Sequence, residues 1–441
     1  MRAYKDSGIE WLGEIPEHWE VVKIKYIFII GRGRVISQEE LDKNGVFPVY
    51  SSQTSNNGIL GYIKTYDFDY EQITWTTDGV NAGTIFLRSG KYNCTNICGT
   101  LKPKRNENMV FLTYALQNAT PYYKRPDTNG AKIMNNEMAN IEIVYPPIEE
   151  QKAIADFLDS KCKLIETFIE KKQKLITLLN EKKQALINEC VTKGLDKNVN
   201  FKDSGIEHLG AIPTHWEIKR LKYIVSLQNQ KSGNIDSLVA SLPQNDEYLC
   251  HSNDSAFSRH SDLERSEREE SHKNNNTNFR IGLENIESKT GKYIPTSEIV
   301  FEEDGIKFEN GDILFGKLRP YLAKVFLADR GGICVSEFLV LRTKGANNHF
   351  LKFLMLSPLF IDIVDSSTYG TKMPRVNWEF IGNLKIPLPP IEEQKQIAKF
   401  LDSEISKIDS IIGKIKKQIE LIKEYKSTLI SQAVCGRIGV Q

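Results

Sequence analysis

Several short stretches of the chain carry residue types that could bind phosphate, a dinucleotide or zinc. Gly311-Asp-Ile-Leu-Phe-Gly-Lys-Leu318 nearly matches a phosphate-binding P-loop, but it lacks the Ser or Thr that would hold magnesium. Gly31-Arg-Gly-Arg-Val-Ile36 has Ile where a dinucleotide motif needs its third Gly. Cys94 and Cys98 have no second pair at zinc-ligand spacing, which favours burial as small hydrophobic residues. These stretches therefore predict turns and core positions, with no nucleotide or metal site.

Covalent chemistry is also poorly supported. Tyr145-Pro-Pro-Ile148 has the two prolines of an amino-methyltransferase motif but lacks its Asn or Asp and its stacking aromatic, so we interpret it as the start of a helix. Pro126-Asp127 has no Asp/Glu-x-Lys partner on a nearby strand, as a nuclease would require. His18 and His215 stand beside tryptophans and are expected to be packing residues. No complete catalytic set remains, and we expect a chain that performs no catalysis itself.

The residue types that remain suit contact with nucleic acid. Basic and aromatic side chains interleave in Tyr122-Tyr-Lys-Arg-Pro126, Lys317-Leu-Arg-Pro-Tyr321 and Lys372-Met-Pro-Arg-Val-Asn-Trp378. Lys and Arg donate to phosphates, and Arg and Asn can bond base edges through two hydrogen bonds. Thr76-Thr-Asp-Gly-Val-Asn-Ala-Gly83 is a polar, glycine-rich stretch that could approach a groove, although a solvated loop is the alternative for every one of these stretches. The candidate DNA-binding residues are Thr76, Thr77, Asp78, Asn81, Lys124, Arg125, Lys132, Lys317, Arg319, Tyr321, Lys372, Arg375 and Asn377.

The elements that position these residues are repeated within the chain. The block Lys5 to Trp19 recurs as Lys202 to Trp216, an offset of 202 − 5 = 197, and the block Pro146 to Ser160 recurs as Pro389 to Ser403, an offset of 389 − 146 = 243. The regions between these blocks, roughly 28–145 and 225–388, show little resemblance to each other. Two matching frameworks around two different inserts predict one scaffold that holds two different recognition surfaces. The alternative is an old duplication whose halves have drifted.

A long helix is predicted after each Pro-Pro pair. In the second copy, apolar residues recur in alternating steps of four and three from Ile397 to Leu429, which is typical of a coiled-coil seam. Lys183 and Lys426 fall on this seam in the two copies. At 1.5 Å per residue, a helix of this kind is roughly 65–70 Å long. We expect the two helices to pack antiparallel, with the variable regions at opposite ends of this spacer; two helices in separate domains are the alternative.

Both variable regions are predicted to be mixed α+β structures, because short β-branched and aromatic runs such as Gln72–Thr76 alternate with Gly and Asn turns. The predicted domains are a first recognition domain at 1–146 with the repeat block 5–27, and a second at 196–389 with the repeat block 202–224. A mobile Ser/Asn-rich insert is expected at about 251–278. The spacer helices are predicted at 147–195 and 390–436.

Composition limits the class of protein. The 441 residues are 40% apolar and 26% charged, which predicts several folded domains. Lys and Arg total 58 against 57 Asp and Glu, for a net charge of +1, so a uniformly basic coat is excluded but a local basic groove is not. No apolar run has membrane-spanning length and no signal peptide is visible. With seven cysteines, an odd and sparse count, the sequence predicts reduced thiols and a cytoplasmic location.

In their order along the chain, these motifs resemble the specificity subunit of Type I restriction-modification enzymes. The resemblance is carried by the repeated Lys5–Trp19 block, the Pro-Pro-Ile-Glu-Glu-Gln-Lys block, Trp75-Thr-Thr-Asp-Gly79 and Gly311–Leu322, and it covers nearly the whole chain. It implies two target-recognition domains held apart by two antiparallel coiled-coil helices. The insert at 251–278 departs from the family pattern and leaves the outline of the second domain open.

The resemblance also implies partners and cofactors. The expected partners are double-stranded DNA, two adenine-N6 methyltransferase subunits and the helicase-nuclease restriction subunits, without a membrane. No cofactor is expected in this chain; S-adenosylmethionine, ATP and magnesium would belong to the partners. Two different recognition surfaces on one spacer predict an asymmetric, split DNA target whose half-sites lie about one helical turn, roughly 34–36 Å, apart. A coiled-coil scaffold that binds only proteins is the alternative of another class, and a fused nuclease or methyltransferase is the enzyme alternative.

Overall fold

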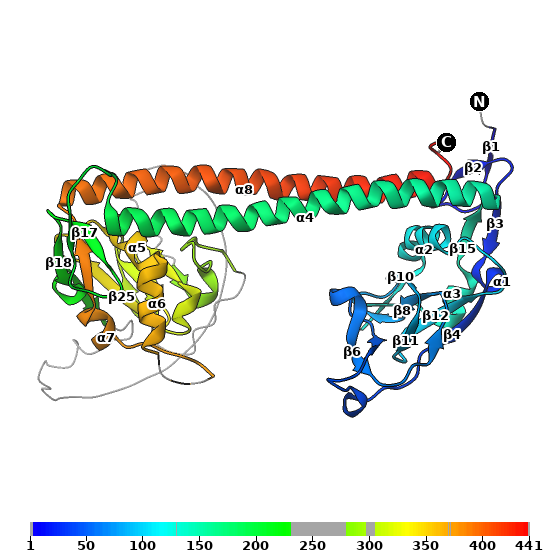
Figure 1. The fold of residues 1–441 in the computed structure, drawn as a ribbon, viewed down its shortest axis with the longest axis horizontal. Helices are drawn as coiled ribbons and strands as arrows, with labels where there is room; N and C mark the ends of the chain where they lie inside the picture. Colours follow the sequence, from blue (N-terminus) through cyan, green and yellow to red (C-terminus); the bar gives the residue numbers. More distant parts are fainter. Residues whose placement is uncertain are drawn as a thin grey trace, which may run out of the picture. The chain divides into compact units, whose positions relative to one another are not determined.

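The computed structural model describes residues 3–128, 130–230, 279–296, 305–368, 370 and 372–439, so the insert predicted at 251–278 lies outside the described residues. The chain forms two compact units: unit 1 comprises Met1–Ile176 and Gly413–Gln441, and unit 2 comprises Thr177–Ile412. Two long helices, α4 (Ile148–Lys193) and α8 (Ile391–Val434), contribute residues to both units (Figure 1). Each unit also combines sheets with short helices, so the predicted α+β class is confirmed.

Unit 1 is built on two four-stranded sheets. The first is antiparallel with the order β10-β8-β12-β4, and the second has the order β6-β5-β11-β7 with a parallel β5–β11 pair. All five residues of the predicted strand Gln72–Thr76 (β8) are buried, because this strand lies inside the first sheet. The helix α2 packs on β10 and begins after Asn108, whose side chain accepts a hydrogen bond from the Phe111 N–H at 2.9 Å.

The elements of unit 1 other than the long helices are β1 (Tyr4–Asp6), β2 (Glu14–Pro16), β3 (Glu20–Lys23), α1 (Ile24–Ile27), β4 (Phe28–Arg32), β5 (Phe47–Tyr50), β6 (Ile59–Ile63), β7 (Phe68–Asp69), β8 (Gln72–Thr76), β9 (Asp78–Gly79), β10 (Ile85–Arg88), β11 (Lys91–Cys94), β12 (Cys98–Pro103), α2 (Met109–Tyr123), β13 (Arg125–Asp127), β14 (Gly130–Lys132), α3 (Asn135–Asn140) and β15 (Glu142–Tyr145). Strand β15 pairs with β3, and β1 pairs with β2. Both pairs contain residues of the repeated N-terminal block or its continuation.

Unit 2 repeats this plan with a different sequence. Its main sheet has the order β23-β22-β25-β19, and its second sheet has the order β20-β24-β21 with a parallel β20–β24 pair. Its elements are β16 (Phe201–Asp203), β17 (Ala211–Pro213), β18 (Glu217–Arg220), β19 (Val225–Gln228), β20 (Arg280–Ile281), β21 (Ile306–Phe308), β22 (Ile313–Gly316), β23 (Val325–Leu327), β24 (Gly332–Cys334), β25 (Phe338–Thr343), α5 (Asn348–Leu356), α6 (Pro358–Ser366), α7 (Trp378–Asn383) and β26 (Lys385–Leu388).

The strand registers make the two plans comparable residue by residue. In unit 1, Ile73 of β8 stands opposite Leu101 and Leu87; in unit 2, Ile313 of β22 stands opposite Leu341 and Leu327. The near-P-loop stretch at Gly311–Leu318 is therefore a central strand that runs into a turn, as the sequence analysis proposed. The two regions whose sequences show little resemblance nevertheless share one topology, which sequence comparison within the chain did not reveal.

A tryptophan joins the ends of the two long helices in unit 1. The buried Trp19 donates from Nε1 to Glu150 Oε2 at 3.2 Å, in the first turn of α4, and His18 Nε2 lies 2.6 Å from the other oxygen of that carboxylate. Gly436, which follows α8 with φ of +70°, lies against the same indole: a Cβ there would be 2.8 Å from the ring. The start of α4 and the end of α8 thus meet at one residue, so the two helices run antiparallel in this unit.

The repeat reproduces this joint in unit 2. Trp216 donates to Glu393 Oε2 at 3.1 Å at the start of α8, and His215 Nε2 lies 2.8 Å from the same oxygen. Gly194, with φ of +76°, ends α4 against the Trp216 ring. The histidine side chains are 50% and 43% exposed, so they are partners of a carboxylate and not the packing residues that the sequence analysis expected.

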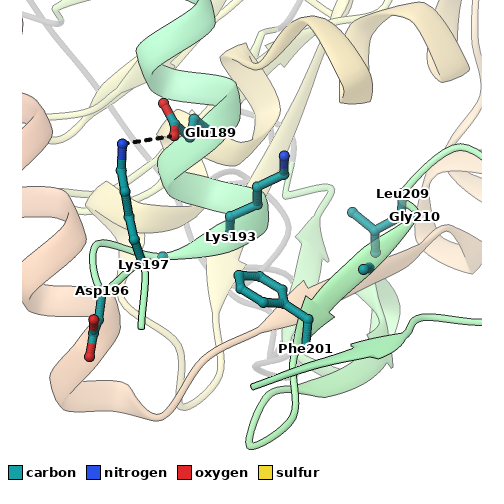
Figure 2. A pocket seen from close by; sticks show the side chains of 9 residues that line it. Glu189, Lys193, Asp196, Lys197, Phe201, Leu209 and Gly210 are labelled. Atoms are coloured by element: carbon teal, nitrogen blue, oxygen red, sulfur yellow. Dashed lines mark ion pairs between the residues drawn. The ribbon is translucent and has the colours of Figure 1, made fainter. Parts of the chain in front are cut away.

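The two joints differ just beyond the ends of the helices. In unit 1, the Arg437 guanidinium crosses the repeat block and donates to the Leu12 carbonyl at 2.8 Å. In unit 2, where Leu195 is the equivalent of Arg437, a cavity of about 530 Å³ lies beside Phe201, Leu209 and Gly210 (Figure 2).

The seam between the long helices is apolar, as predicted. Ile165 of α4 and Leu429 of α8 are buried in the core of unit 1, and Ile187 of α4 is buried with Ile397 and Leu401 of α8 in the core of unit 2. The apolar residues of both helices therefore pack into the cores of the units as well as against the other helix.

Both seam lysines form ion pairs across the helix pair. Lys183, which is 3% exposed, places Nζ 2.9 Å from Asp409 Oδ1, and Lys426 places Nζ 2.7 Å from Glu166 Oε1. Each pair occupies the same position of the repeat, because 426 − 183 and 409 − 166 both equal 243. A paired lysine at a seam position fixes the register of the helices.

Replacing Trp216 by Ala should lower the free energy of unfolding by about 3–5 kcal/mol, because a buried indole is lost and the Glu393 carboxylate loses a donor. Urea denaturation of the full chain measures the change. Tyr223→Ala is the control, since that side chain is 66% exposed, and it should shift stability by no more than about 0.5 kcal/mol. Equal effects of the two substitutions would show that the tryptophan does not hold the helix ends.

Candidate nucleic-acid interface

In unit 1, the polar loop after β8 and the basic hairpin β13–β14 form one small sheet of order β13-β14-β9. The pairing of β14 with β9 sets Lys132 opposite Asp78. Lys132 Nζ lies 3.2 Å from Asp127 Oδ2 and 3.3 Å from Asp78 Oδ2. The hydrogen bonds to Asp127 and then to Asp78 raise the pKa of Lys132, so its ammonium remains charged. The structure therefore brings together three regions that the sequence analysis selected separately.

Thr76 and Thr77 are corrected by the structure. Both side chains are 1% exposed, so neither is placed to touch a ligand. The Thr76 hydroxyl donates to the Asn81 carbonyl, and the Thr77 hydroxyl donates to the Ile97 carbonyl at 3.1 Å. These threonines hold the loop in shape; the other two candidates of the loop, Asp78 and Asn81, are half-buried and lie on either side of the exposed Val80.

The remaining candidates of unit 1 are exposed. Lys124 and Arg125 follow α2, and the Arg125 guanidinium pairs with the Glu137 carboxylate. Glu137 also accepts the Met134 N–H at 2.6 Å, which ties the start of α3 to the hairpin. Arg125 is therefore anchored beside Lys132 on a defined element, while Lys124 extends from it.

In unit 2, the stretches Lys317–Tyr321 and Lys372–Asn377 lie side by side. Leu318 forms a β-bridge with Arg375, and the Arg319 N–H donates to the Pro374 carbonyl at 2.8 Å. The Arg375 guanidinium holds the Glu337 carboxylate through two hydrogen bonds, of 2.8 Å and 3.3 Å. The structure thus joins two basic stretches that are more than fifty residues apart in the sequence.

The other candidates of unit 2 differ in how exposed they are and in how far their conformation and hydrogen bonds are fixed. Tyr321 is 44% exposed, and Lys372 is exposed as well. Arg319 has φ of +51°, a left-handed conformation that turns the chain just before Pro320. The side-chain oxygen of Asn377 accepts a hydrogen bond from the Phe380 N–H at 2.8 Å, so it caps α7 and already has a hydrogen-bond donor.

Lys132 and Arg375 occupy the same place in the two units. Each stands opposite the second residue after the central strand, Asp78 in unit 1 and Leu318 in unit 2. The next residue of each segment donates its N–H to the first residue after that strand, at 2.9 Å for Ile133 and 3.2 Å for Val376. A short helix follows in both cases, α3 or α7. One backbone frame therefore presents a lysine beside two aspartates in one unit and an arginine beside one glutamate in the other.

The sequence analysis missed the carboxylates that hold these cations. Glu337 was not among the candidate residues, and Asp127 was considered only as part of an incomplete nuclease motif. Arg32 was also missed: its guanidinium lies 3.5 Å from the Thr77 hydroxyl, at the edge of the same loop. A basic residue at the end of a strand beside glycines is a signal that could have identified Arg32 as a surface contact.

These arrangements suit the binding of an anion or a base edge. Cations held by carboxylates beside exposed aromatic residues can exchange a carboxylate for a phosphate or a base edge. In the part of the chain that the structure describes, no group of three or more His, Cys, Asp or Glu could hold a metal ion. The six cysteines of that part are free and buried, and burial raises the pKa of Cys98 to about 11. Nor is any described helix apolar over a length sufficient to span a bilayer.

Comparison with known proteins identifies the family to which this architecture belongs. The model of the Type I restriction modification DNA specificity domain matches residues 16–178 and 265–421, one stretch for each half of the chain. The chain belongs to this family. The specificity-domain matches cover most of both units, including the segments that carry Lys132 and Arg375.

Individual relatives agree with this assignment. The MpnII specificity subunit of Mycoplasma pneumoniae, a Type I restriction enzyme subunit, is 42% identical over 142 residues, which is 32% of this chain and 43% of that protein. The MjaVIII specificity subunit of Methanocaldococcus jannaschii is 27% identical over 464 residues, covering 100% of this chain and 98% of that protein. A chain solved in a study of complex assembly and conformational transition of a type I R-M system shares the fold, with a TM-score of 0.65 at 14% identity over 96% of this chain and 99% of that one.

Proposed function

We propose that this chain recognises an asymmetric, two-part DNA sequence through its two units, and that α4 and α8 set the distance between the two half-sites. The observation that carries the proposal is the shared frame with different side chains: Lys132 beside Asp78 and Asp127 in unit 1, and Arg375 beside Glu337 in unit 2. Two domains that recognise different DNA sequences need different contact residues, and here these residues lie on the same backbone scaffold.

We assign residues 1–146 and 196–389 to the two recognition domains and 147–195 and 390–436 to the spacer helices. In support, α4 and α8 have 46 and 44 residues, or roughly 65–70 Å at 1.5 Å per residue. The ion pairs Lys183–Asp409 and Lys426–Glu166 fix the register of the helices and thereby a constant length.

The proposed partners are two adenine-N6 methyltransferase subunits and the helicase-nuclease restriction subunits. In this assembly the chain is the non-catalytic member, and S-adenosylmethionine, ATP and magnesium bind to the partners. A location in the cytoplasm follows, because the DNA and these partners are there. The net charge of +1 fits a protein whose DNA affinity is completed by contacts from other subunits.

Methyl transfer to DNA tests this division of labour. The modification subunit of the same restriction-modification system should methylate a target duplex only when this chain is present. The chain alone, supplied with S-adenosylmethionine, should transfer no methyl group. Methylation by the chain alone would contradict its non-catalytic role, and sequence-specific methylation by the partner alone would contradict its role in recognition.

Replacing Arg375 by Met should weaken DNA binding by the complex and lower the slope of log affinity against log salt by about 0.9, the value for one lost phosphate contact. If Arg375 instead contacts a base, the DNA sequence specificity at one half-site should relax, with little change in the salt slope. Fluorescence anisotropy at several salt concentrations measures both effects. Glu337→Gln is the matched control: it removes the negative charge beside Arg375 and keeps the arginine, so binding should be kept or strengthened. Unchanged affinity, slope and specificity for Arg375→Met would remove this residue from the interface.

A further inference from the structure

Unit 2 contains a cavity of about 230 Å³ where α4, α5, α8 and the loop after Glu287 meet. Its charged lining residues come from all four segments and are mostly basic. They are Lys183, Lys289, Lys292, Lys352, Asp402 and Asp409. Four cations against two carboxylates leave the cavity with an excess of positive charge.

The two carboxylates already have partners. Asp409 receives Lys183 Nζ at 2.9 Å on one oxygen and Lys292 Nζ at 2.6 Å on the other. Asp402 lies 3.2 Å from His349 Nδ1. Among the described residues, no carboxylate lies within ion-pair distance of Lys352 or Lys289.

Of the four lysines, Lys352 is in the least favourable electrostatic environment. Its side chain is half-buried, and this burial is the main cause that lowers the pKa of Lys352. Asp402 opposes the shift, and the neighbouring ammonium groups of Lys183 and Lys292 add to it. A cation that is partly removed from water, with no carboxylate close enough to pair with it, is costly, and a bound anion would relieve that cost.

The internal repeat shows that the helix pair does not need these extra lysines. In unit 1, the equivalent ion pair is Lys426–Glu166, and the equivalent of Asp402 is Asp159, since 402 − 159 is also 243. There, Asp159 accepts a hydrogen bond from the neutral Tyr114 hydroxyl at 2.8 Å. The additional cations are therefore a property of the cavity of unit 2 and not of the spacer.

We propose that this cavity holds a phosphate group, bound by Lys352, Lys289 and Lys292. A tetrahedral anion with some water fits a space of this size, and lysine ammonium groups supply the point charges that phosphate binding uses. The source of the phosphate rests on the proposed function: it is a backbone phosphate of the bound duplex. Free phosphate has the same chemistry, and two measurements separate the two sources.

The first measurement titrates inorganic phosphate into the full chain without DNA, at constant ionic strength, by calorimetry. The wild type should bind phosphate, and Lys352→Met should weaken binding at least about tenfold, the effect of losing one charge-assisted hydrogen bond. Because the substitution removes an unpaired cation, the melting temperature of the variant should not fall. Lys289→Met, at an exposed position, is the second variant should Lys352→Met fold poorly. Lys344→Met is the control, an exposed lysine outside the cavity lining, and it should bind phosphate like the wild type.

The second measurement is the salt dependence of DNA binding by the complex. If the cavity takes a DNA phosphate, Lys352→Met lowers the salt slope by about 0.9, and Lys344→Met leaves it unchanged. Phosphate binding with an unchanged slope supports the site with free phosphate as its ligand. No phosphate binding and no change in slope overturns the site. Arg375→Met distinguishes this failure from failure of the proposed function, because the interface at Arg375 stands if that variant alone weakens DNA binding.

Discussion

Exchanging residues 28–145 for the corresponding region of another specificity subunit should replace one half of the methylated sequence and leave the other half unchanged. The region contains both four-stranded sheets of unit 1 and the hairpin of Lys132, whereas the joint at Trp19 and the helix α4 lie outside it. Since the exchanged segment carries the recognition surface and the retained segments carry the helix contacts, the assembly should persist with a new half-site.

Mapping of methylated adenines in cells that carry the hybrid and its partner subunits measures this result. The reciprocal exchange of residues 225–388 is the matched control, and it should alter only the opposite half-site. A change in both half-sites after either exchange would mean that the two units do not read DNA independently.

Adding seven residues to both α4 and α8, between Ile176 and Thr177 and between Ile412 and Gly413, should widen the gap between the half-sites without changing either of them. Seven residues are one heptad, which keeps the seam in phase and adds about 10.5 Å of helix. At 3.4 Å per base pair, the gap should grow by at most about three base pairs, because the twist of DNA also rotates the second half-site.

Insertion into α4 alone is the control for this lengthening. It would shift Lys183 away from Asp409 while α8 stays fixed, so it should destabilise the helix pair and not lengthen it in an orderly way. Methylation mapping gives the gap, and urea denaturation gives the stability. A methylated sequence with an unchanged gap in the double insertion would show that the helices do not set the distance.

Much of this architecture could be predicted because it depends on local pattern. The buried run Gln72–Thr76 forms β8, the Pro-Pro pairs precede α4 and α8, and the four-and-three spacing from Ile397 to Leu429 forms the seam. Each of these features depends on residues close in sequence, whose periodicity matches one type of element.

The interface was harder to predict because its contacts join distant segments. The pairing of Arg375 with Glu337 spans 38 residues, and the equivalence of Lys132 and Arg375 depends on strand register, with no similarity of side chains to indicate it. Thr76 and Thr77 look like surface residues in the sequence, because a polar loop and a buried turn whose hydroxyls bond internal carbonyls have the same composition.

The most direct measurement is long-read mapping of methylated adenines in cells that contain this chain and the modification subunit of the same system. We predict one motif made of two unlike half-sites that are separated by a fixed number of unspecified base pairs, and we expect this motif to disappear when the chain is removed. A continuous or palindromic motif, or a motif that persists without the chain, would contradict this prediction.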